Sequence, residues 1–180
     1  NISVETQSNV NQTRVFQLIE AYRNRGHQKA NLDPLGLKPI RYADDLEIEF
    51  YGLDSSNLSE VFKLDSFNIG KKSASLSEIL KALESIYCQT LGIEYNHISS
   101  LSERLWFQKR LEPNLGKLNF DPEEQKYILK RLSSAEGLAK FLASRYPGMK
   151  RFGIDGAESL IPLVDSLIQN CGVFGAEQIC

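Results

Sequence analysis

The segment AYRNRGHQKANLDPLGL, residues 21–37, concentrates side chains that could bind an anion or exchange protons. Arg23, Arg25 and His27 gather where an amphipathic helix is expected to stop, at Gly26. Such a group could form an anion-binding or catalytic site. Cations in the last turn of a helix also complement the negative end of its dipole, which is worth ~0.3–1 kcal/mol. Because anions bind more naturally at helix N-termini, the positions favour the structural interpretation.

The LDPLGL sequence that follows predicts a turn. Asp33 can accept hydrogen bonds from the backbone ahead of it, the proline fixes φ, and Gly36 can adopt a positive φ. Asp33 can instead pair with Arg23 or Arg25 and hold the loop against its own helix. We favour this second role, so these three residues and His27 are expected to organise a structural loop.

A second candidate site lies in MKRFGIDGAESLIP, residues 149–162. Lys150 and Arg151 precede Phe152, two glycines and an expected helix N-terminus. A strip of this kind can approach an anionic or polar ligand closely. The alternative is a basic loop that leads into a capped helix. No glycine-rich nucleotide-binding motif accompanies it, so the pattern alone favours the loop.

The remaining candidates do not form a catalytic or metal-binding set in the sequence. His97 has no neighbouring cysteine or second histidine, and it is expected to be a hydrogen-bonded packing residue. Cys88, Cys171 and Cys180 are too few and too scattered for a disulfide framework, which favours a reducing, cytosolic compartment. The sequence therefore predicts no catalytic residue in this chain.

Composition bounds the class of protein that holds these residues. Among 180 residues, 42% are hydrophobic and 24% are charged, as in ordinary globular proteins. A net charge of −2 gives no general attraction to nucleic acid or to an anionic membrane surface. No apolar run approaches the ~20 residues that span a bilayer, and the polar start is not a secretory signal.

Capping signals predict a mainly α chain. The first helix is expected to bury one face, and later helices are expected to start where an N-cap residue precedes an acidic residue by three. Pro162 is expected in the first turn of the last helix. The expected starts are Asn57 with Glu60, Ser75 with Glu78, Ser100 with Glu103, Asp121 with Pro122, Ser133 with Glu136, and Asp155 with Glu158.

Two segments are compatible with strands. LEIEFYGL, residues 46–53, alternates in polarity, although no second strand is evident nearby. FGAEQIC, residues 174–180, resembles the beginning of a strand and suggests the N-terminal piece of a longer polypeptide. The expected organisation is a flexible arm over 1–10, a helix with the RGH and LDPLG loop over 11–44, a helical domain over 45–174, and the start of a truncated α/β domain over 175–180.

The sequence RVFQLIEAYRNRGHQKANLDPLGL resembles the N-terminal region of the thiamine-dependent decarboxylating component of the 2-oxoglutarate dehydrogenase complex. That family reads approximately R-V-x-x-L-I-x-A-Y-R-x-R-G-H-x-x-A-x-L-D-P-L-G-L. The similarity continues through FNIGKKSASLSEILKALESIYCQTLGIEYNHI, ERLWFQKRLE and AEGLAKFLASRYPGMKRFGIDGAESLIPLVDSLI, so it covers nearly the whole chain in order.

The resemblance implies a helical layer that precedes two α/β domains, which bind thiamine diphosphate and Mg2+, and a C-terminal domain. The family's enzyme is a homodimer that decarboxylates 2-oxoglutarate and transfers succinyl to lipoyl groups. Its partners are dihydrolipoyl succinyltransferase and lipoamide dehydrogenase. In the family the KRFG block lies near the active centre, so Phe152 and Arg151 are expected to line the substrate pocket. Phe152, where the 2-oxoadipate branch tends to carry tyrosine, favours 2-oxoglutarate.

The family's other catalytic and cofactor-binding motifs follow the region that this chain resembles. We therefore expect the 180 residues alone to bind no thiamine diphosphate or Mg2+ and to be inactive. The alternative is a non-catalytic helical module that docks on the acyltransferase or lipoamide dehydrogenase. The expected compartment is the cytoplasm of a bacterium, which we favour, or the mitochondrial matrix of a eukaryote.

Overall fold

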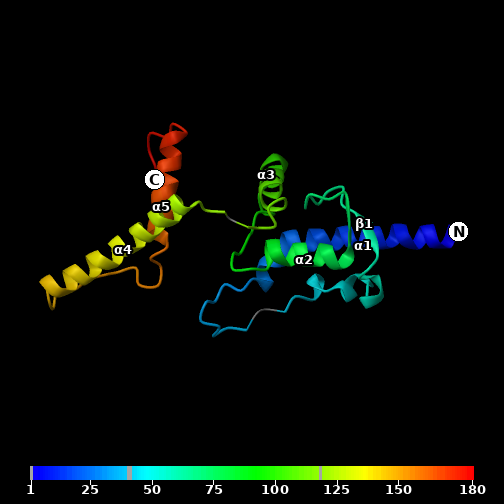
Figure 1. Cartoon of the computed structure of the whole chain (residues 1–180), viewed down its shortest axis with the longest axis horizontal. Coiled ribbons are helices and arrows are strands. Elements are labelled where there is room, and N and C mark those ends of the chain that lie inside the picture. The colour runs from blue at the N-terminus through cyan, green and yellow to red at the C-terminus, as the bar shows by residue number, and fades with distance from the viewer. Residues whose placement is uncertain (1, 40–41, 118) are drawn as a thin grey trace. The chain divides into compact units, whose positions relative to one another are not determined.

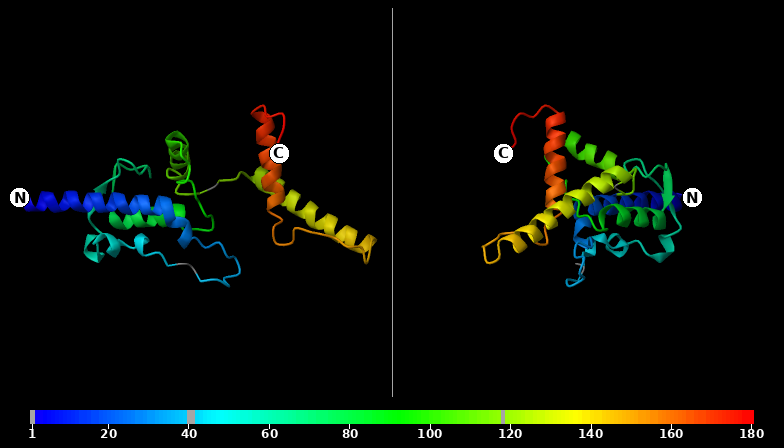
Figure 2. Two further views of the ribbon diagram at one scale, coloured as in Figure 1. Left: turned by 180° about the vertical axis from the view of Figure 1, so that it is seen from behind. Right: turned by 60° about the vertical axis from the view of Figure 1, so that its left-hand side comes forward.

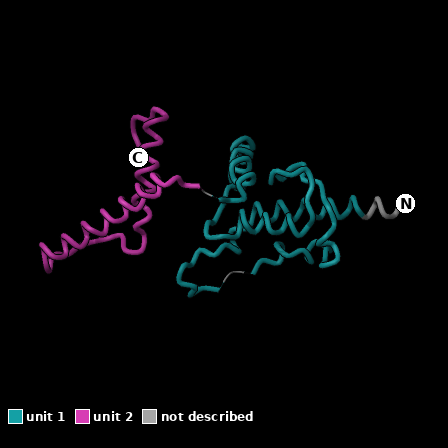
Figure 3. The backbone as a smooth tube through the Cα atoms, in the orientation of Figure 1, with its two compact units in different colours: residues 1–118 teal, residues 119–180 magenta. Residues whose placement is uncertain are grey.

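The computed structural model describes residues 2–39, 42–117 and 119–180, with side chains from residue 8 onward (Figure 1). The chain forms two compact units, residues 1–118 (unit 1) and residues 119–180 (unit 2), shown in Figure 3. This division differs from the expected boundaries after residues 44 and 174. The mainly α fold is confirmed, since the described residues form five α-helices, short 3-10 helices and a sheet of two short strands.

Helix α1 (Ile2–Arg25) is the longest element of unit 1 and supplies one side of its core. Val15, Leu18 and Ile19 are fully buried, as the sequence pattern predicts. Residues 2–10, which the sequence analysis assigns to a flexible arm, form the first part of this helix. The side chains of residues 8–10 are exposed, so this part of the helix extends beyond the core.

Helix α1 stops where Gly26 lies against α2 (Leu76–Tyr87). A Cβ atom at Gly26 would lie 2.5 Å from the Cβ of Tyr87, so only glycine permits this close approach. The chain continues as the 3-10 helix η1 (Gly26–Lys29). Figure 2 shows α2 running beside α1 in both views. The expected helix stop at Gly26 is therefore confirmed.

The expected strand in LEIEFYGL is wrong. Its residues fall mainly in the 3-10 helices η2 (Asp44–Leu46) and η3 (Ile48–Tyr51), and Gly52 ends η3 with a φ of 67°. The Tyr51 hydroxyl donates to the Asp45 carbonyl at 2.9 Å, which closes the segment on itself. The alternating pattern places Leu46 and Leu53 in the core without any partner strand.

The short helix expected after Asn57 is also wrong. Asp54 caps the 3-10 helix η4 (Ser55–Asn57), and the next residues form β1 (Val61–Lys63). Strand β1 pairs antiparallel with β2 (Ser73–Ser75), with Phe62 opposite Ala74. Phe62 is buried and its two neighbours are exposed, which is the alternation of a strand with one face on the core.

Helices α2 and α3 (Leu101–Leu111) begin at the predicted caps. The Ser75 hydroxyl accepts from the Glu78 amide, and the Glu78 carboxylate accepts from the Ser75 amide, which is a capping box. The Ser100 hydroxyl caps α3 by accepting from the amide of Glu103. Helix α2 buries six residues, and it faces α1 across a core shared with β1 and the 3-10 segments.

Unit 2 consists of α4 (Pro122–Arg145), α5 (Leu160–Val173) and the segments around them. Asp121 caps α4 by accepting from the amides of Glu123 and Glu124, as predicted. A separate helix starting at Ser133 is wrong, because α4 runs on without a break. The Ser134 hydroxyl donates back to the Lys130 carbonyl, which is how serine is accommodated within a helix.

The last helix starts later than predicted. Its N-cap is Ser159 and not Asp155, although Pro162 does lie in the first turn. The Glu158 carboxylate accepts from the Gly156 amide instead of supporting a cap at Asp155. Residues 176–180 adopt neither helix nor strand, so the strand expected at the C-terminus is not present in these described residues.

Candidate functional site

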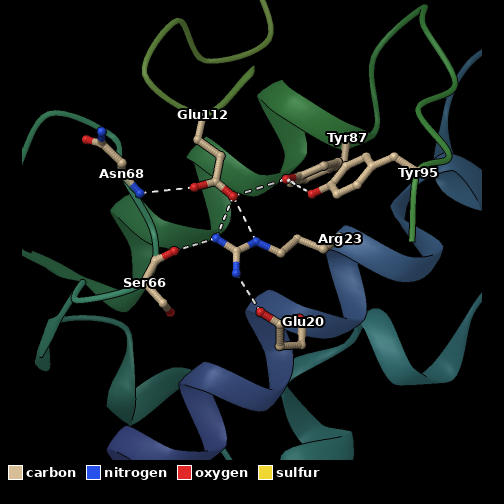
Figure 4. A network of polar contacts seen from close by, with 7 residues as sticks. All are labelled: Glu20, Arg23, Ser66, Asn68, Tyr87, Tyr95 and Glu112. Carbon is tan, nitrogen blue, oxygen red and sulfur yellow. Dashed lines mark hydrogen bonds and ion pairs between the residues drawn. The ribbon is translucent and has the colours of Figure 1, made fainter. Parts of the chain in front are cut away.

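Arg23 lies at the centre of a buried polar network in unit 1 (Figure 4). Its side chain is 3% exposed, and its Nε donates to Glu112 Oε1 at 2.8 Å. A second nitrogen of the guanidinium, Nη2, lies 2.6 Å from the same oxygen and donates to the Ser66 carbonyl. Nη1 pairs with Glu20 one turn earlier on α1. The arginine therefore holds α1, α3 and the turn after β1 together.

The Glu112 carboxylate, 2% exposed at the end of α3, is satisfied by further donors. The Asn68 amide donates to Oε2 at 3.1 Å, and the Tyr87 hydroxyl donates to Oε1 at 3.2 Å. The hydroxyls of Tyr87 and Tyr95 lie 3.0 Å apart, as Figure 4 shows. The network thus extends to α2 and to the loop that precedes α3.

Burial dominates the electrostatics of this network. Desolvation raises the pKa of Glu112, against the opposing influences of Arg23 and the Asn68 amide. Desolvation would lower the pKa of Arg23, but the charges and hydrogen bonds of Glu112 and Glu20 raise it on balance. Burial also raises the pKa of Tyr87. Burial thus favours the neutral form of Glu112, and the charged Arg23, which donates to it, opposes this shift. Because these groups are hydrogen-bonded to one another, the network holds the surrounding segments together.

Sequence reasoning missed Glu112. The residue stands 89 positions after Arg23 and is followed directly by a proline, so the sequence indicates only the end of a helix there. The one local signal for Glu112 is its position between Leu111 and Leu115, which are both partly buried against the core. That signal predicts a site near the core, but it does not identify Arg23 as the partner.

Arg25 and His27 lie at the same helix end but point to other partners. Arg25 Nη1 donates to Asp45 at 2.9 Å, and Nη2 donates to Gln28 at 3.2 Å. His27 Nε2 lies 3.7 Å from Glu94. Its Nδ1 is buried, and no described residue hydrogen-bonds to it. A cleft of about 620 Å3 opens beside His27, lined mainly by the loop that follows.

The expected pairing of Asp33 with Arg23 or Arg25 is wrong. Asp33 accepts from the amides of Leu35 at 3.0 Å and Lys38 at 2.8 Å, so it organises its own turn. These backbone hydrogen bonds, with that of Lys38 the largest influence, lower the pKa of Asp33. The turn itself is confirmed, including the positive φ of Gly36. Both arginines are engaged by other carboxylates.

In the candidate strip of unit 2, residues 149–154 follow α4 and adopt neither helix nor strand. Arg151 Nη1 donates to the carbonyls of Leu142 and Tyr146 at 3.1 and 3.2 Å. Phe152 is 97% exposed. A hollow of about 700 Å3 lies beside these residues, with apolar lining from α4, the strip itself and Ile161. Arg151 and Phe152 thus adjoin the same hollow, but Arg151 binds the end of α4 whereas the ring of Phe152 is exposed.

The other sequence candidates do not join a site. His97 is exposed, so the expectation of a packed histidine is wrong. Burial raises the pKa of the Cys88 thiol to about 11, which makes it a poor nucleophile at neutral pH. Within residues 2–39, 42–117 and 119–180, no three His, Cys, Asp or Glu side chains are grouped to hold a metal. No helix of the described chain is long and apolar enough to cross a bilayer.

Comparison with known proteins identifies relatives that are much longer than this chain. No family model matches the chain. It is 46% identical over 177 residues to the 2-oxoglutarate dehydrogenase E1 component of Azotobacter vinelandii, which covers 98% of this chain and 19% of that protein. The proteins of the same name from Brucella anthropi and Cupriavidus necator are 42% and 43% identical over 97% and 91% of the chain. The chain spans less than a fifth of the length of these relatives.

Proposed function

Because the chain matches the N-terminal part of 2-oxoglutarate dehydrogenase E1 components, we propose that it is the helical N-terminal layer of such an enzyme. The whole enzyme decarboxylates 2-oxoglutarate and passes the succinyl group to a lipoyl group of its complex. The observation that carries this proposal is 46% identity over 98% of the chain. The matched region extends through both units of the chain.

Thiamine diphosphate and Mg2+ belong, in this proposal, to the parts of the enzyme outside this chain. When bound there, the cofactor would supply a carbon nucleophile for the 2-oxo acid, and Mg2+ would balance the charge of the diphosphate. The residues of this chain contribute by shaping the surface around the substrate. Phe152 and Arg151 line the approach to the substrate, and the 180 residues alone neither bind the cofactor nor turn over substrate.

Unit 1 serves as a rigid support. The Arg23–Glu112 network ties five segments of the chain, and Arg25, His27 and Asp33 shape the loop over residues 26–38. That loop carries exposed apolar side chains at Leu35 and Leu37. Apolar side chains held on an ordered loop suit a contact with another domain of the same polypeptide.

Unit 2 presents several exposed apolar side chains. Leu163, Leu167 and Ile168 of α5 are at least half exposed, and Val173 and Phe174 are exposed by 82% and 86%. Burying such surface is favourable by ~25 cal/mol per Å2. We infer that the catalytic domains of the same polypeptide cover this face. The parent is a homodimer and meets its succinyltransferase and lipoamide dehydrogenase partners in the cytoplasm of a bacterium.

The test begins with the gene, read past the codon of Cys180. A frame that continues to about five times this length is expected, since the chain covers 19% of its relative. The protein from that frame should reduce ferricyanide with 2-oxoglutarate when thiamine diphosphate and Mg2+ are present. The 180-residue chain should give no turnover under the same conditions.

A stop codon directly after Cys180 would contradict the proposal. The exposed apolar face of α5 would then favour a non-catalytic module that docks on the acyltransferase or lipoamide dehydrogenase. Pull-down of purified acyltransferase and lipoamide dehydrogenase by the 180-residue chain separates the two outcomes. Turnover of 2-oxoglutarate by the 180 residues alone would contradict both.

A further inference from the structure

The segment that follows α4 is fixed at its start by one side chain. Arg151 reaches back, and its Nη1 donates to the carbonyls of Leu142 and Tyr146 at 3.1 and 3.2 Å. A turn with Gly148 at a φ of 82° redirects the chain so that this return is possible. The guanidinium therefore lies at the C-terminal end of α4, within unit 2.

This contact has a clear physical reason. The last carbonyls of a helix lack amide partners within the helix, and the C-terminus carries the negative end of the dipole. An arginine near this end satisfies the carbonyls and complements the dipole. The Leu142 carbonyl already accepts from the Tyr146 amide at 3.0 Å, so Arg151 adds a second donor to it. The guanidinium is thus used by the chain itself.

The same segment is fixed again after Phe152. The Ala157 amide donates to the Ile154 carbonyl at 2.7 Å, and the Glu158 carboxylate accepts from the Gly156 amide at 3.1 Å. The Asp155 carboxylate lies close to Gly153, since a Cβ atom added at Gly153 would be 3.1 Å from one of its oxygens. Phe152 therefore stands between two anchored points of the backbone.

Between these anchors, the Phe152 ring is 97% exposed. It adjoins the hollow of about 700 Å3, to which Met149 and Ile154 also contribute. An aromatic ring held in water on an anchored segment is costly unless another surface receives it. The structure thus separates two tasks: Phe152 presents a ring outward, and Arg151 holds the backbone from which the ring projects.

We propose that Arg151 is a positioning residue for Phe152, acting through the end of α4, and that it does not bind the distal carboxylate of the substrate. The proposal rests on the proposed function, in which Phe152 lines the pocket for a 2-oxo acid. In this proposal the ring of Phe152 makes the contact that determines substrate specificity. The guanidinium of Arg151 instead binds the last carbonyls of α4.

The first test uses the 180-residue chain and needs no substrate. NMR relaxation measures the order of the Phe152 amide in the wild-type chain, in Arg151→Gln, in Arg151→Lys and in Lys150→Gln. Lys150 is the adjacent exposed cation and provides the matched control. Arg151→Gln should lower the heteronuclear NOE of Phe152, Arg151→Lys should restore part of it, and Lys150→Gln should leave it unchanged. An unchanged NOE in Arg151→Gln would overturn the proposal.

The second test uses the whole enzyme and two substrates. 2-Oxoglutarate carries a distal carboxylate, and 2-oxovalerate has a methyl group in its place. If Arg151 positions Phe152, Arg151→Gln should lower kcat/KM for both substrates by the same factor, about ten- to a hundred-fold for a misplaced contact. A loss confined to 2-oxoglutarate would mean that Arg151 binds the carboxylate, which would overturn the proposal.

The two tests keep this proposal apart from the proposed function. If the whole protein processes no 2-oxo acid, the proposed function fails, and the NMR test still decides whether Arg151 orders Phe152. If the whole enzyme is active and the NMR test fails, only the positioning role is overturned.

Discussion

The two units of this chain differ in where their apolar side chains lie. Unit 1 contains all 18 buried hydrophobic residues among those whose side chains the structure describes, between Val15 and Tyr95. In residues 119–180, all of which the structure describes, Pro162 is the sole buried residue. Because burial of apolar surface is the main force that drives folding, we expect the core to stabilise unit 1 more strongly than the contacts within unit 2 stabilise that unit.

The largest effect should come from the buried ion pair of unit 1. Arg23→Leu leaves the Glu112 carboxylate buried without its partner, and we expect a loss of ~3–5 kcal/mol in the free energy of unfolding. Urea unfolding followed by circular dichroism measures it. Arg25→Leu is the control, because its pair with Asp45 is partly exposed and worth ~0–1 kcal/mol. Equal losses in the two variants would contradict the central role of the network.

A pair of matched truncations compares the units directly. Leu83 is fully buried in unit 1, whereas Leu163 is 61% exposed in unit 2. Leu83→Ala should cost ~2–5 kcal/mol in the free energy of unfolding, because it leaves a cavity. Leu163→Ala should stay within ~0.5 kcal/mol, as exposed positions do. A comparable loss at Leu163 would show that α5 packs inside the chain itself.

The reactivity of two cysteine thiols, Cys88 in unit 1 and Cys180 in unit 2, also distinguishes the units. Burial raises the pKa of Cys88 to about 11, and its thiol donates to the Gly26 carbonyl at 3.4 Å. Cys180 is exposed. Ellman's reagent at pH 8 should therefore modify Cys180 quickly and Cys88 only as unit 1 unfolds. Peptide mass mapping over time distinguishes the two, and equal rates would contradict the packing of α1 on α2.

The smallest effect concerns the start of α2. A hydrogen bond from Lys71, and then one from the Ser75 amide, lower the pKa of Glu78 to about 2. A depressed pKa adds stability above the ordinary value near 4.5, and this stability is lost as the pH falls toward 2. Glu78→Gln should lower the free energy of unfolding at pH 7 and flatten its decline in this window. An unchanged acid profile in the variant would contradict the cap.

Local signals in the sequence predicted the helices whose starts are fixed by nearby residues. Ser75 with Glu78 and Asp121 with Pro122 specify their caps within four positions, and both are present. The pattern of LEIEFYGL was misleading because consecutive 3-10 helices can also place apolar side chains in the core at intervals of a few residues. The strand β1 was missed because its three residues gain their structure from β2, ten residues later.

The candidate site was predictable to a similar extent. Arg23, Arg25 and His27 were correctly placed at a helix end, and the turn at Asp33 was correct. Their partners were not predictable, because Glu112 and Asp45 come from segments that only the folded chain brings near. The pocket role of Phe152 remains a prediction from the family resemblance, and no local pattern indicates that its ring is exposed.

Hydrogen exchange of the 180-residue chain tests the contrast between the units most directly. Amides of residues 15–23 and 76–87 should exchange slowly, because they open only when the core of unit 1 unfolds. Amides of α4 and α5 should exchange much faster, since residues 119–180 bury almost nothing within the chain. Mass spectrometry at peptide resolution gives both rates in one experiment. Equal protection of the two units would contradict the account.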